Sequence, residues 1–235
     1  NSPILSNSQF NKFINFFGKN SINLDCTFLQ NENLTNAITR IQKEAEIAVR
    51  QGVKQLVLSD KDLSSEKLPI PMLLCVGAIN TFLIEKKLRG YVSINVQSGE
   101  ALDTHSFATL IGVGATTVNP YLAFDSLYQR YSKKLFGQFS FDECVQRYIK
   151  SVNAGLLKIM SKMGISVLSS YRGGCNFETV GLSRTVVNDY FPGVTSKISG
   201  IGLTGIEKKI REIHKEAFES TETVLPIGGI YRYRK

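Results

Sequence analysis

Hydrophobic positions along this chain follow two periodicities that alternate with each other. Apolar residues recur at helical spacing over residues 34–51, 71–87, 105–113, 141–163 and 205–219. Between them lie short apolar runs at residues 54–60, 91–96, 116–119 and 165–169. Because such strands recur about every 25–35 residues with a helix between them, the pattern predicts βαβ units and an α/β fold with a mostly parallel sheet. The strands are expected near Leu56, Val92, Thr117 and Val167.

The remaining segments complete the expected layout. Short helices are predicted at residues 177–182 and 185–190. Residues 123–138 interrupt the rhythm, since they are aromatic and basic, and are interpreted as a connecting excursion. The length of 235 residues fits one large or two small domains, and no internal repeat or low-complexity linker is visible. The point at which residues 1–235 could subdivide is near residues 124–140.

Polar residues follow the predicted strands at their carboxyl ends, where parallel sheets carry their chemistry. These ends are Ser59-Asp60, Ser98-Gly99-Glu100 and Asn119-Pro120-Tyr121. Asp60, Glu100 and Asp103 could act as general acids or bases in a cleft. Helix capping is the favoured alternative, above all for Asp103, which directly precedes an apolar helix.

Other candidate motifs each have an ordinary structural explanation. Residues 200–205 match the dinucleotide-binding pattern G-x-G-x-x-G, but the preceding strand is short and no acidic residue ends a following strand. Thr204 and Glu207 are therefore interpreted as a helix capping box. No nucleophile-elbow sequence accompanies His105, so a Ser-His catalytic triad is not predicted. Cys175 could be a thiolate but is favoured as a small apolar filler. The loop 169–174 is either an anion-binding or interface loop or a structural turn.

The composition indicates which kinds of ligand, such as nucleic acids and metal ions, the chain is expected to bind or not to bind. The chain has 28 Lys and Arg against 20 Asp and Glu, a net charge of +8, which invites a nucleic-acid interpretation. Its basic groups lie on predicted helices without interleaved aromatic residues, so no nucleic-acid binding is expected. The four cysteines form no CxxC pair, and with two histidines the chain is expected to bind no metal and to come from a reducing, intracellular environment.

A long uncharged segment raises the question of a membrane. Residues 104–124 contain no Asp, Glu, Lys or Arg and are numerous enough to span a bilayer. Gly112, Gly114, Asn119 and Pro120 would be poor choices for a lipid-facing helix. We therefore expect a buried helix, a turn and a strand, with no membrane segment and no visible signal peptide.

Three stretches of sequence together resemble one family. They are residues 113–123 (VGATTVNPYLA), residues 155–166 (GLLKIMSKMGIS) continuing into Ser170-Tyr171-Arg172-Gly173, and residues 190–203. The chain resembles the large subunit of glutamate synthase, which makes glutamate from 2-oxoglutarate and glutamine. The similarity extends to residues 2–5, 58–60 and 227–234, and so covers essentially the whole chain.

The resemblance implies the central domain of that enzyme, which is similar to a degenerate TIM barrel. In the family, a glutaminase domain precedes this domain, and a barrel with FMN and a [3Fe–4S] cluster follows it. The resemblance therefore implies no catalytic, cofactor-binding or metal-binding residue in this chain, and inactivity of the isolated chain. Ferredoxin or an NAD(P)H-oxidising subunit would supply electrons, in a bacterial cytoplasm or a plastid stroma.

The same resemblance suggests where ammonia and neighbouring domains would meet this chain. Asn119, Pro120 and Tyr121 are candidates for the wall of an ammonia conduit, because an amide and a phenol pass neutral ammonia without a carboxylate to trap it. That Asn119 merely caps a strand loop is equally open. Lys162 and Tyr171-Arg172 are candidate domain-contact residues. The alternatives are an autonomous α/β enzyme that uses Asp60 or Glu100, and a basic nucleic-acid-binding protein.

Overall fold

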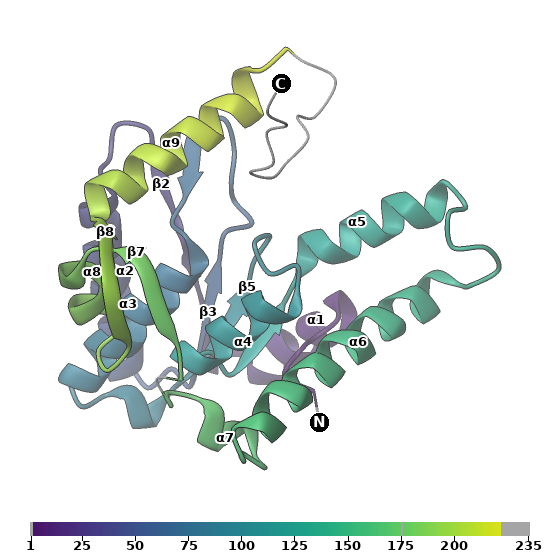
Figure 1. Cartoon of the computed structure of the whole chain (residues 1–235), viewed down its shortest axis with the longest axis horizontal. Coiled ribbons are helices and arrows are strands. Elements are labelled where there is room, and N and C mark those ends of the chain that lie inside the picture. The colour runs from purple at the N-terminus through teal and green to yellow at the C-terminus, as the bar shows by residue number, and fades with distance from the viewer. Residues whose placement is uncertain (1, 175, 222–235) are drawn as a thin grey trace.

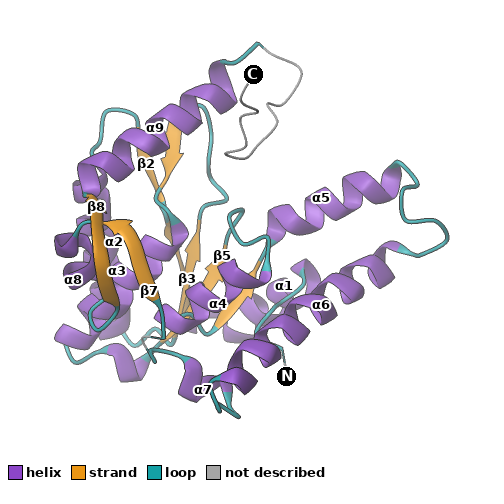
Figure 2. Cartoon of the chain, in the orientation of Figure 1, coloured by secondary structure: helices purple, strands orange, loops and turns teal. Residues whose placement is uncertain are grey.

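The computed structural model describes residues 2–174 and 176–221 (Figures 1 and 2). The helices are α1 (Asn7–Phe17), α2 (Leu34–Arg50), α3 (Met72–Glu85), α4 (Thr104–Val113), α5 (Tyr121–Ser132), α6 (Phe141–Lys162), α7 (Leu168–Tyr171), α8 (Arg184–Tyr190) and α9 (Leu203–Glu219), with 3-10 turns η1 (Gly18–Asn20) and η2 (Arg89–Tyr91). The strands are β1 (Ser21–Asp25), β2 (Thr27–Leu29), β3 (Gln55–Ser59), β4 (Lys67–Pro69), β5 (Ser93–Gln97), β6 (Thr117–Asn119), β7 (Glu178–Leu182) and β8 (Thr195–Ile201).

A parallel sheet with strand order β1-β3-β5-β6 forms the centre of the fold. The strands predicted near Leu56, Val92 and Thr117 are confirmed as β3, β5 and β6. Helices α2, α3 and α4 connect successive strands, and the strands lie side by side in the order in which they occur along the chain. A doubly wound sheet would instead reverse direction at a switch point. The α/β prediction is confirmed, and the topology is that of half a βα barrel.

The two faces of this sheet differ in polarity because side chains alternate along each strand. One face contributes Leu56, Leu58, Ile94, Val96 and Val118 to the main hydrophobic core, together with residues of α2, α3 and α4. The other face carries hydroxyl and amide side chains, joined across strands by hydrogen bonds. Ser59 Oγ donates to Gln97 Oε1 at 2.9 Å, and Gln97 Nε2 donates to Asn119 Oδ1 at 3.3 Å. A row of neutral polar groups therefore joins β3, β5 and β6 at the carboxyl end of the sheet, and Asp25 occupies the corresponding position on β1.

The strand predicted near Val167 is wrong, as α7 begins at Leu168 instead. The sheet offers no edge for it beside β6. Val118 N donates to Pro3 O at 2.9 Å, and Leu5 N donates to Val118 O at 2.9 Å, so the N-terminal segment already pairs with β6. Val167 is accordingly exposed.

Residues 177–182, predicted as a helix, form strand β7, which pairs in parallel with β8. The strands approach very closely. Gly181 has φ +84°, and a Cβ on Gly200 would overlap the Gly181 carbonyl. Pairing with β8, the next strand along the chain, overrides the local pattern here. The helix predicted at residues 185–190 is confirmed as α8.

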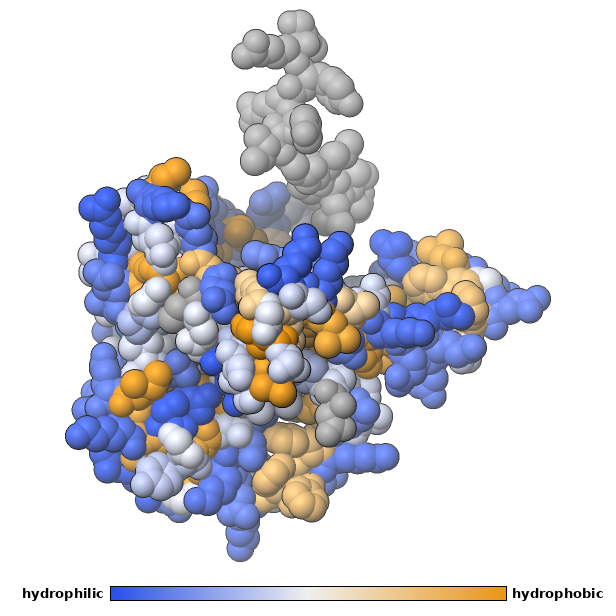
Figure 3. All heavy atoms as spheres, turned by 60° about the horizontal axis from the view of Figure 1, so that its bottom comes forward, coloured by the Kyte–Doolittle hydropathy of each residue, from blue (hydrophilic) through white to orange (hydrophobic). Residues whose placement is uncertain are grey.

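Of residues 123–138, interpreted as a connecting excursion, residues 123–132 belong to helix α5, and residues 133–138 form the turn that follows it. Helices α5 and α6 run side by side and project from the sheet as an arm (Figure 1). The rings of Tyr128 and Phe141 meet edge-on at 5.4 Å and hold the two helices together. Figure 3 shows hydrophobic and hydrophilic side chains interspersed on the arm, where Leu135 and Phe139 are exposed. No helix within the described residues is both long and apolar enough to cross a membrane.

Candidate functional site at the carboxyl ends of the strands

One buried carboxylate joins the ends of three strands. Asp60, which follows β3, is 3% exposed. Ser98 Oγ, after β5, donates to Asp60 Oδ2 at 2.6 Å, and Gly99 N donates to the same carboxylate at 3.1 Å. The Tyr121 hydroxyl, just after β6, also hydrogen-bonds to Asp60. The loops after β3, β5 and β6 are therefore fixed around one acceptor.

The electrostatics of this cluster follow from its burial. Burial raises the pKa of Asp60 even though Ser98, Gly99 and Tyr121 donate to its charged form. Glu100 is exposed as a residue, but partial desolvation of its carboxyl group raises its pKa, and the neighbouring charge of Asp60 acts in the same direction. The pKa of Tyr121 is raised by burial and by Asp60, so the phenol stays protonated and remains a donor.

Glu100 and Asp103 are helix caps. Glu100 Oε2 accepts from Met72 N at 2.9 Å, at the first turn of α3, whose N-cap Pro71 provides no side-chain bond. Asp103 Oδ1 accepts from Ser106 N at 2.9 Å and from Ser106 Oγ at 2.7 Å, which caps α4. Capping of the next helix is therefore confirmed for Asp103. It is wrong for Glu100, which caps the earlier helix α3, and for Asp60, which accepts from Ser98 and Gly99 instead.

Asn119 is 1% exposed and fully hydrogen-bonded. Its Nδ2 donates to Leu5 O at 3.0 Å and to Asn7 Oδ1 at 2.9 Å, while its Oδ1 accepts from Gln97 Nε2 at 3.3 Å. The amide thus ties β6 to β5 and to the N-terminal segment. Pro120 is buried at the N-cap of α5, and Tyr121 is half-buried.

The candidate domain-contact residues have different surroundings. Lys162, at the end of α6, is exposed. Tyr171 is 1% exposed, and its hydroxyl donates to Ala108 O at 3.2 Å, so its side chain belongs to the core. Arg172 is half-buried beside it, and Gly173 N donates to Gly112 O at 2.8 Å, which attaches this loop to α4.

The capping box predicted for Thr204 and Glu207 is wrong. The N-cap of α9 is Gly202, which makes no side-chain hydrogen bond. Glu207 Oε2 instead accepts from Leu34 N at 2.9 Å and so caps the distant helix α2. His105 is exposed, and Cys175 lies outside the described residues.

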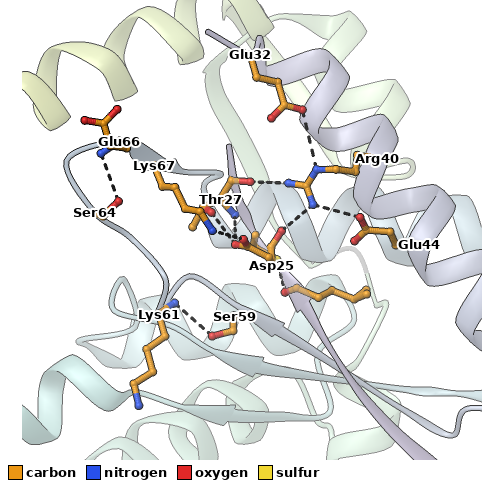
Figure 4. Close-up of polar contacts among 12 residues, drawn as sticks. Asp25, Thr27, Glu32, Arg40, Glu44, Ser59, Lys61, Ser64, Glu66 and Lys67 are labelled. Atoms are coloured by element: carbon orange, nitrogen blue, oxygen red, sulfur yellow. Dashed lines mark hydrogen bonds and ion pairs between the residues drawn. The ribbon is translucent and has the colours of Figure 1, made fainter. Parts of the chain in front are cut away.

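A second polar cluster, which the sequence interpretation missed, surrounds Asp25 at the end of β1 (Figure 4). Thr27 Oγ1 donates to Asp25 Oδ1 at 2.6 Å, and Lys67 Nζ lies 3.0 Å from Asp25 Oδ2. Burial acts to raise the pKa of Asp25, but the bonds from Thr27 and Lys67 outweigh it and leave the pKa lowered. Arg40 Nη1 donates to Asp25 O at 3.2 Å. The position of Asp25 at a strand end was the available sequence signal.

An apolar groove of ≈ 360 Å³ lies beside Glu100, with α9 as one wall. It is lined mainly by Leu63, Pro69, Pro71, Ile201, Ile206, Ile210, Ile213 and Phe218. Within residues 2–174 and 176–221, no group of three His, Cys, Asp or Glu side chains is arranged to hold a metal ion. The strand-end residues therefore provide a buried hydrogen-bonded cluster next to an apolar surface.

Comparisons with known proteins cover the whole chain. A family model described as the glutamate synthase central domain matches residues 1–183. The NADPH glutamate synthase large chain of Azospirillum brasilense is 47% identical over 237 residues, covering 100% of this chain and 16% of that protein. That of Bacillus subtilis is 40% identical and covers 99% of this chain and 15% of that protein. The ferredoxin-dependent glutamate synthase of Pyropia yezoensis is 40% identical and covers 99% of this chain and 16% of that protein.

Solved structures give weaker similarity. DHODH from Eimeria tenella in complex with ferulenol has a TM-score of 0.44 and 13% identity, over 66% of this chain and 38% of that chain. A flavocytochrome b2 variant with sulfite bound has a TM-score of 0.43 and 17% identity, over 57% of this chain and 32% of that chain. The chain spans about a sixth of the length of the curated relatives named above.

Proposed function

Because this chain belongs to the glutamate synthase central-domain family, we propose that it couples the release of ammonia from glutamine to the FMN-dependent formation of L-glutamate from 2-oxoglutarate. The observation that carries the proposal is the 47% identity over the full chain, combined with a coverage of only 16% of that relative. A glutaminase domain and an FMN-binding domain of the same polypeptide would be its partners. Relatives named for NADPH and for ferredoxin are both similar, so either electron donor is compatible.

The coupling step is proposed to use the carboxyl end of the sheet near Asn119, Pro120 and Tyr121. Ammonia has to travel uncharged, and hydroxyl and amide groups can exchange hydrogen bonds with it without holding ammonium by charge. The one buried carboxylate here, Asp60, already accepts from Ser98, Gly99 and Tyr121. These features support a conduit wall at this edge. The saturated hydrogen bonding of Asn119 equally supports a purely structural role for that residue.

The residues that the structure describes do not fit FMN or a [3Fe–4S] cluster. The glycine-rich run at residues 200–205 leaves no space for a phosphate at Gly200, because β7 lies against it at Gly181. Cys26, Cys75 and Cys144 are buried, and no described group of three cysteines is arranged as a ligand set. Both groups are therefore assigned to other parts of the polypeptide, and the chain itself is proposed to be inactive. Lys162 and Arg172 are proposed to contact those parts.

The alternative of an autonomous enzyme is weakened by the state of its two candidate carboxylates. Asp60 is buried and accepts from three donors, and Glu100 Oε2 caps α3, so both carboxylates already have a structural role. The test is to assay glutamine-dependent glutamate formation for the 235-residue chain and for the complete glutamate synthase polypeptide. Activity is expected for the complete polypeptide alone. Turnover by the short chain would overturn the proposal.

A further inference from the structure

Two arginines that are distant in sequence lie on segments that converge near the C-terminal end of α4. Arg89, in η2, donates from Nη2 to Gly114 O at 2.9 Å, from Nη1 to Val92 O at 2.6 Å and from Nε to Asn80 Oδ1 at 2.7 Å. All three acceptors are neutral. The guanidinium is therefore fixed in position while its charge is left without a carboxylate.

Arg172 reaches the same place from the loop after α7. Tyr171 anchors this loop in the core, and the bond from Gly173 N to Gly112 O attaches it one turn from Gly114. Arg172 Nε is buried and has no hydrogen-bond partner among the described residues. A buried guanidinium N–H without an acceptor is costly, so this group is prepared for an acceptor supplied from elsewhere.

The two positive charges are not compensated within the described part of the chain. Neither Arg89 nor Arg172 takes part in any ion pair between described residues. Burial lowers the pKa of Arg89, and the charge of Arg172 lowers it further, so each side chain lies in the electrostatic field of the other. The C-terminal dipole of α4 offsets part of this repulsion but gives Arg172 Nε no acceptor.

We propose that Arg89 and Arg172 together bind one oxyanion, a carboxylate or phosphate group, beside the C-terminal end of α4. Guanidinium groups bind such groups through parallel N–H donors, and Arg89 is already oriented by its three bonds. Gly173 and Gly174, which follow Arg172, are exposed, so the loop that carries this arginine faces solvent. The loop 169–174 is thereby assigned the anion-binding role rather than that of a simple turn.

The oxyanion could come from solution or from a carboxylate side chain elsewhere in the same polypeptide, and the second source rests on the proposed function. The first arm of the test measures the melting temperature of the 235-residue chain in potassium chloride and in potassium phosphate of equal ionic strength. The variants are Arg172→Gln, Arg172→Lys and, as a matched control, Arg184→Gln at an exposed position on α8. Phosphate is expected to raise the melting temperature of wild type and Arg184→Gln by a few degrees, with no rise in Arg172→Gln and a partial rise in Arg172→Lys.

The second arm repeats the measurements on the complete glutamate synthase polypeptide. If a carboxylate of that polypeptide occupies the site, phosphate gives no rise there, and Arg172→Gln lowers the melting temperature more than it does in the short chain. The proposal is overturned if Arg172→Gln responds to phosphate as wild type does, or if wild type shows no response in the short chain and no additional loss in the complete polypeptide. The phosphate arm does not depend on glutamate synthase activity, so its failure is distinct from failure of the proposed function.

Discussion

The Tyr121 hydroxyl, at the start of α5, donates a hydrogen bond to the Asp60 carboxylate at the end of β3. These two residues follow strands that are not neighbours, because β5 lies between β3 and β6. Ser98, after β5, donates to the same carboxylate at 2.6 Å. One acidic side chain thus sets the relative positions of three consecutive βα loops. A buried carboxylate thus holds together the edge at which a βα barrel places its chemistry.

Glu100→Gln tests the electrostatics of this edge. Partial desolvation raises the pKa of Glu100, so above its ordinary pKa of 4.5 the folded chain keeps a proton that the unfolded chain has already lost. Unfolding then releases a proton, and the stability of the wild type falls as the pH rises through this window. A glutamine still accepts the bond from Met72 N but does not titrate. The variant is therefore expected to gain stability relative to wild type from acid to neutral pH, as measured by urea unfolding at each pH.

Glu143→Gln is a control for which the opposite pH dependence of stability is expected. Glu143 has a lowered pKa because it accepts hydrogen bonds from Ser140 in an exposed capping box. Its contribution is present above the ordinary pKa and is lost as the pH falls, so this variant should be less stable than wild type at neutral pH and equal to it in acid. If Glu100→Gln showed the same trend as Glu143→Gln, Glu100 would be ionised in the folded chain without penalty.

Glu207→Ala tests the capping of α2 by a residue of α9. Removal of Glu207 leaves Leu34 N without its acceptor and removes the partner of Arg211, so a loss of about 1–2 kcal/mol is expected. Thr204→Ala removes the other half of the capping box expected from sequence and should have little effect. Urea unfolding of both variants decides between the two arrangements. Equal losses would restore the local capping box.

Gly200→Ala tests the close approach of β7 and β8. A Cβ at this position would overlap the carbonyl of Gly181, and the strands would have to separate, at an expected cost of about 1–3 kcal/mol. Gly90→Ala is the matched control, because a Cβ there meets no heavy atom within 4 Å. Thermal unfolding of both variants provides the comparison. A Gly200→Ala variant as stable as Gly90→Ala would show that the glycine is not required for strand packing.

The sequence predicted those parts of the fold that depend on local periodicity. Strands β3, β5 and β6 were identifiable because each is a short apolar run followed by a helix. The strand expected near Val167 failed because strand formation also needs a free sheet edge, and the pairing of Ile4 with Val118 occupies the edge beside β6. Strand β7 was missed for the complementary reason, since its partner β8 makes it a strand.

In the candidate site, too, the positions of residues could be predicted from local sequence, whereas their contacts could not. Asp60, Glu100 and Tyr121 could be placed at strand ends from sequence, because parallel strands share one carboxyl edge. The identity of their partners could not be predicted, as the donor to Glu100 is Met72 on an earlier helix. Glu207 is the clearest case: its partner Leu34 is 173 positions away, and no local pattern encodes that contact.

Asn119→Asp, in the complete glutamate synthase polypeptide, tests the proposed conduit. A carboxylate at this edge would favour ammonium over ammonia and hold it by charge, so less ammonia would reach the flavin while the glutaminase site continued to turn over. The expected result is an increase in the ratio of glutamine consumed to glutamate formed. The substitution also places an acceptor where Asn119 Nδ2 now donates to Leu5 O and Asn7 Oδ1, so some loss of stability is expected in addition.

Asn95→Asp separates these two effects. Asn95 lies on the same polar face of the sheet but one pair of residues further from the carboxyl end, is 0% exposed, and donates to Gln55 Oε1 and Leu56 O. It should lose stability as Asn119→Asp does, yet keep the wild-type ratio of glutamine consumed to glutamate formed. Equal changes in the ratio for both variants would indicate a general loosening of the sheet. An unchanged ratio in a folded Asn119→Asp enzyme would place Asn119 away from the ammonia path, with its role confined to joining β5, β6 and the N-terminal segment.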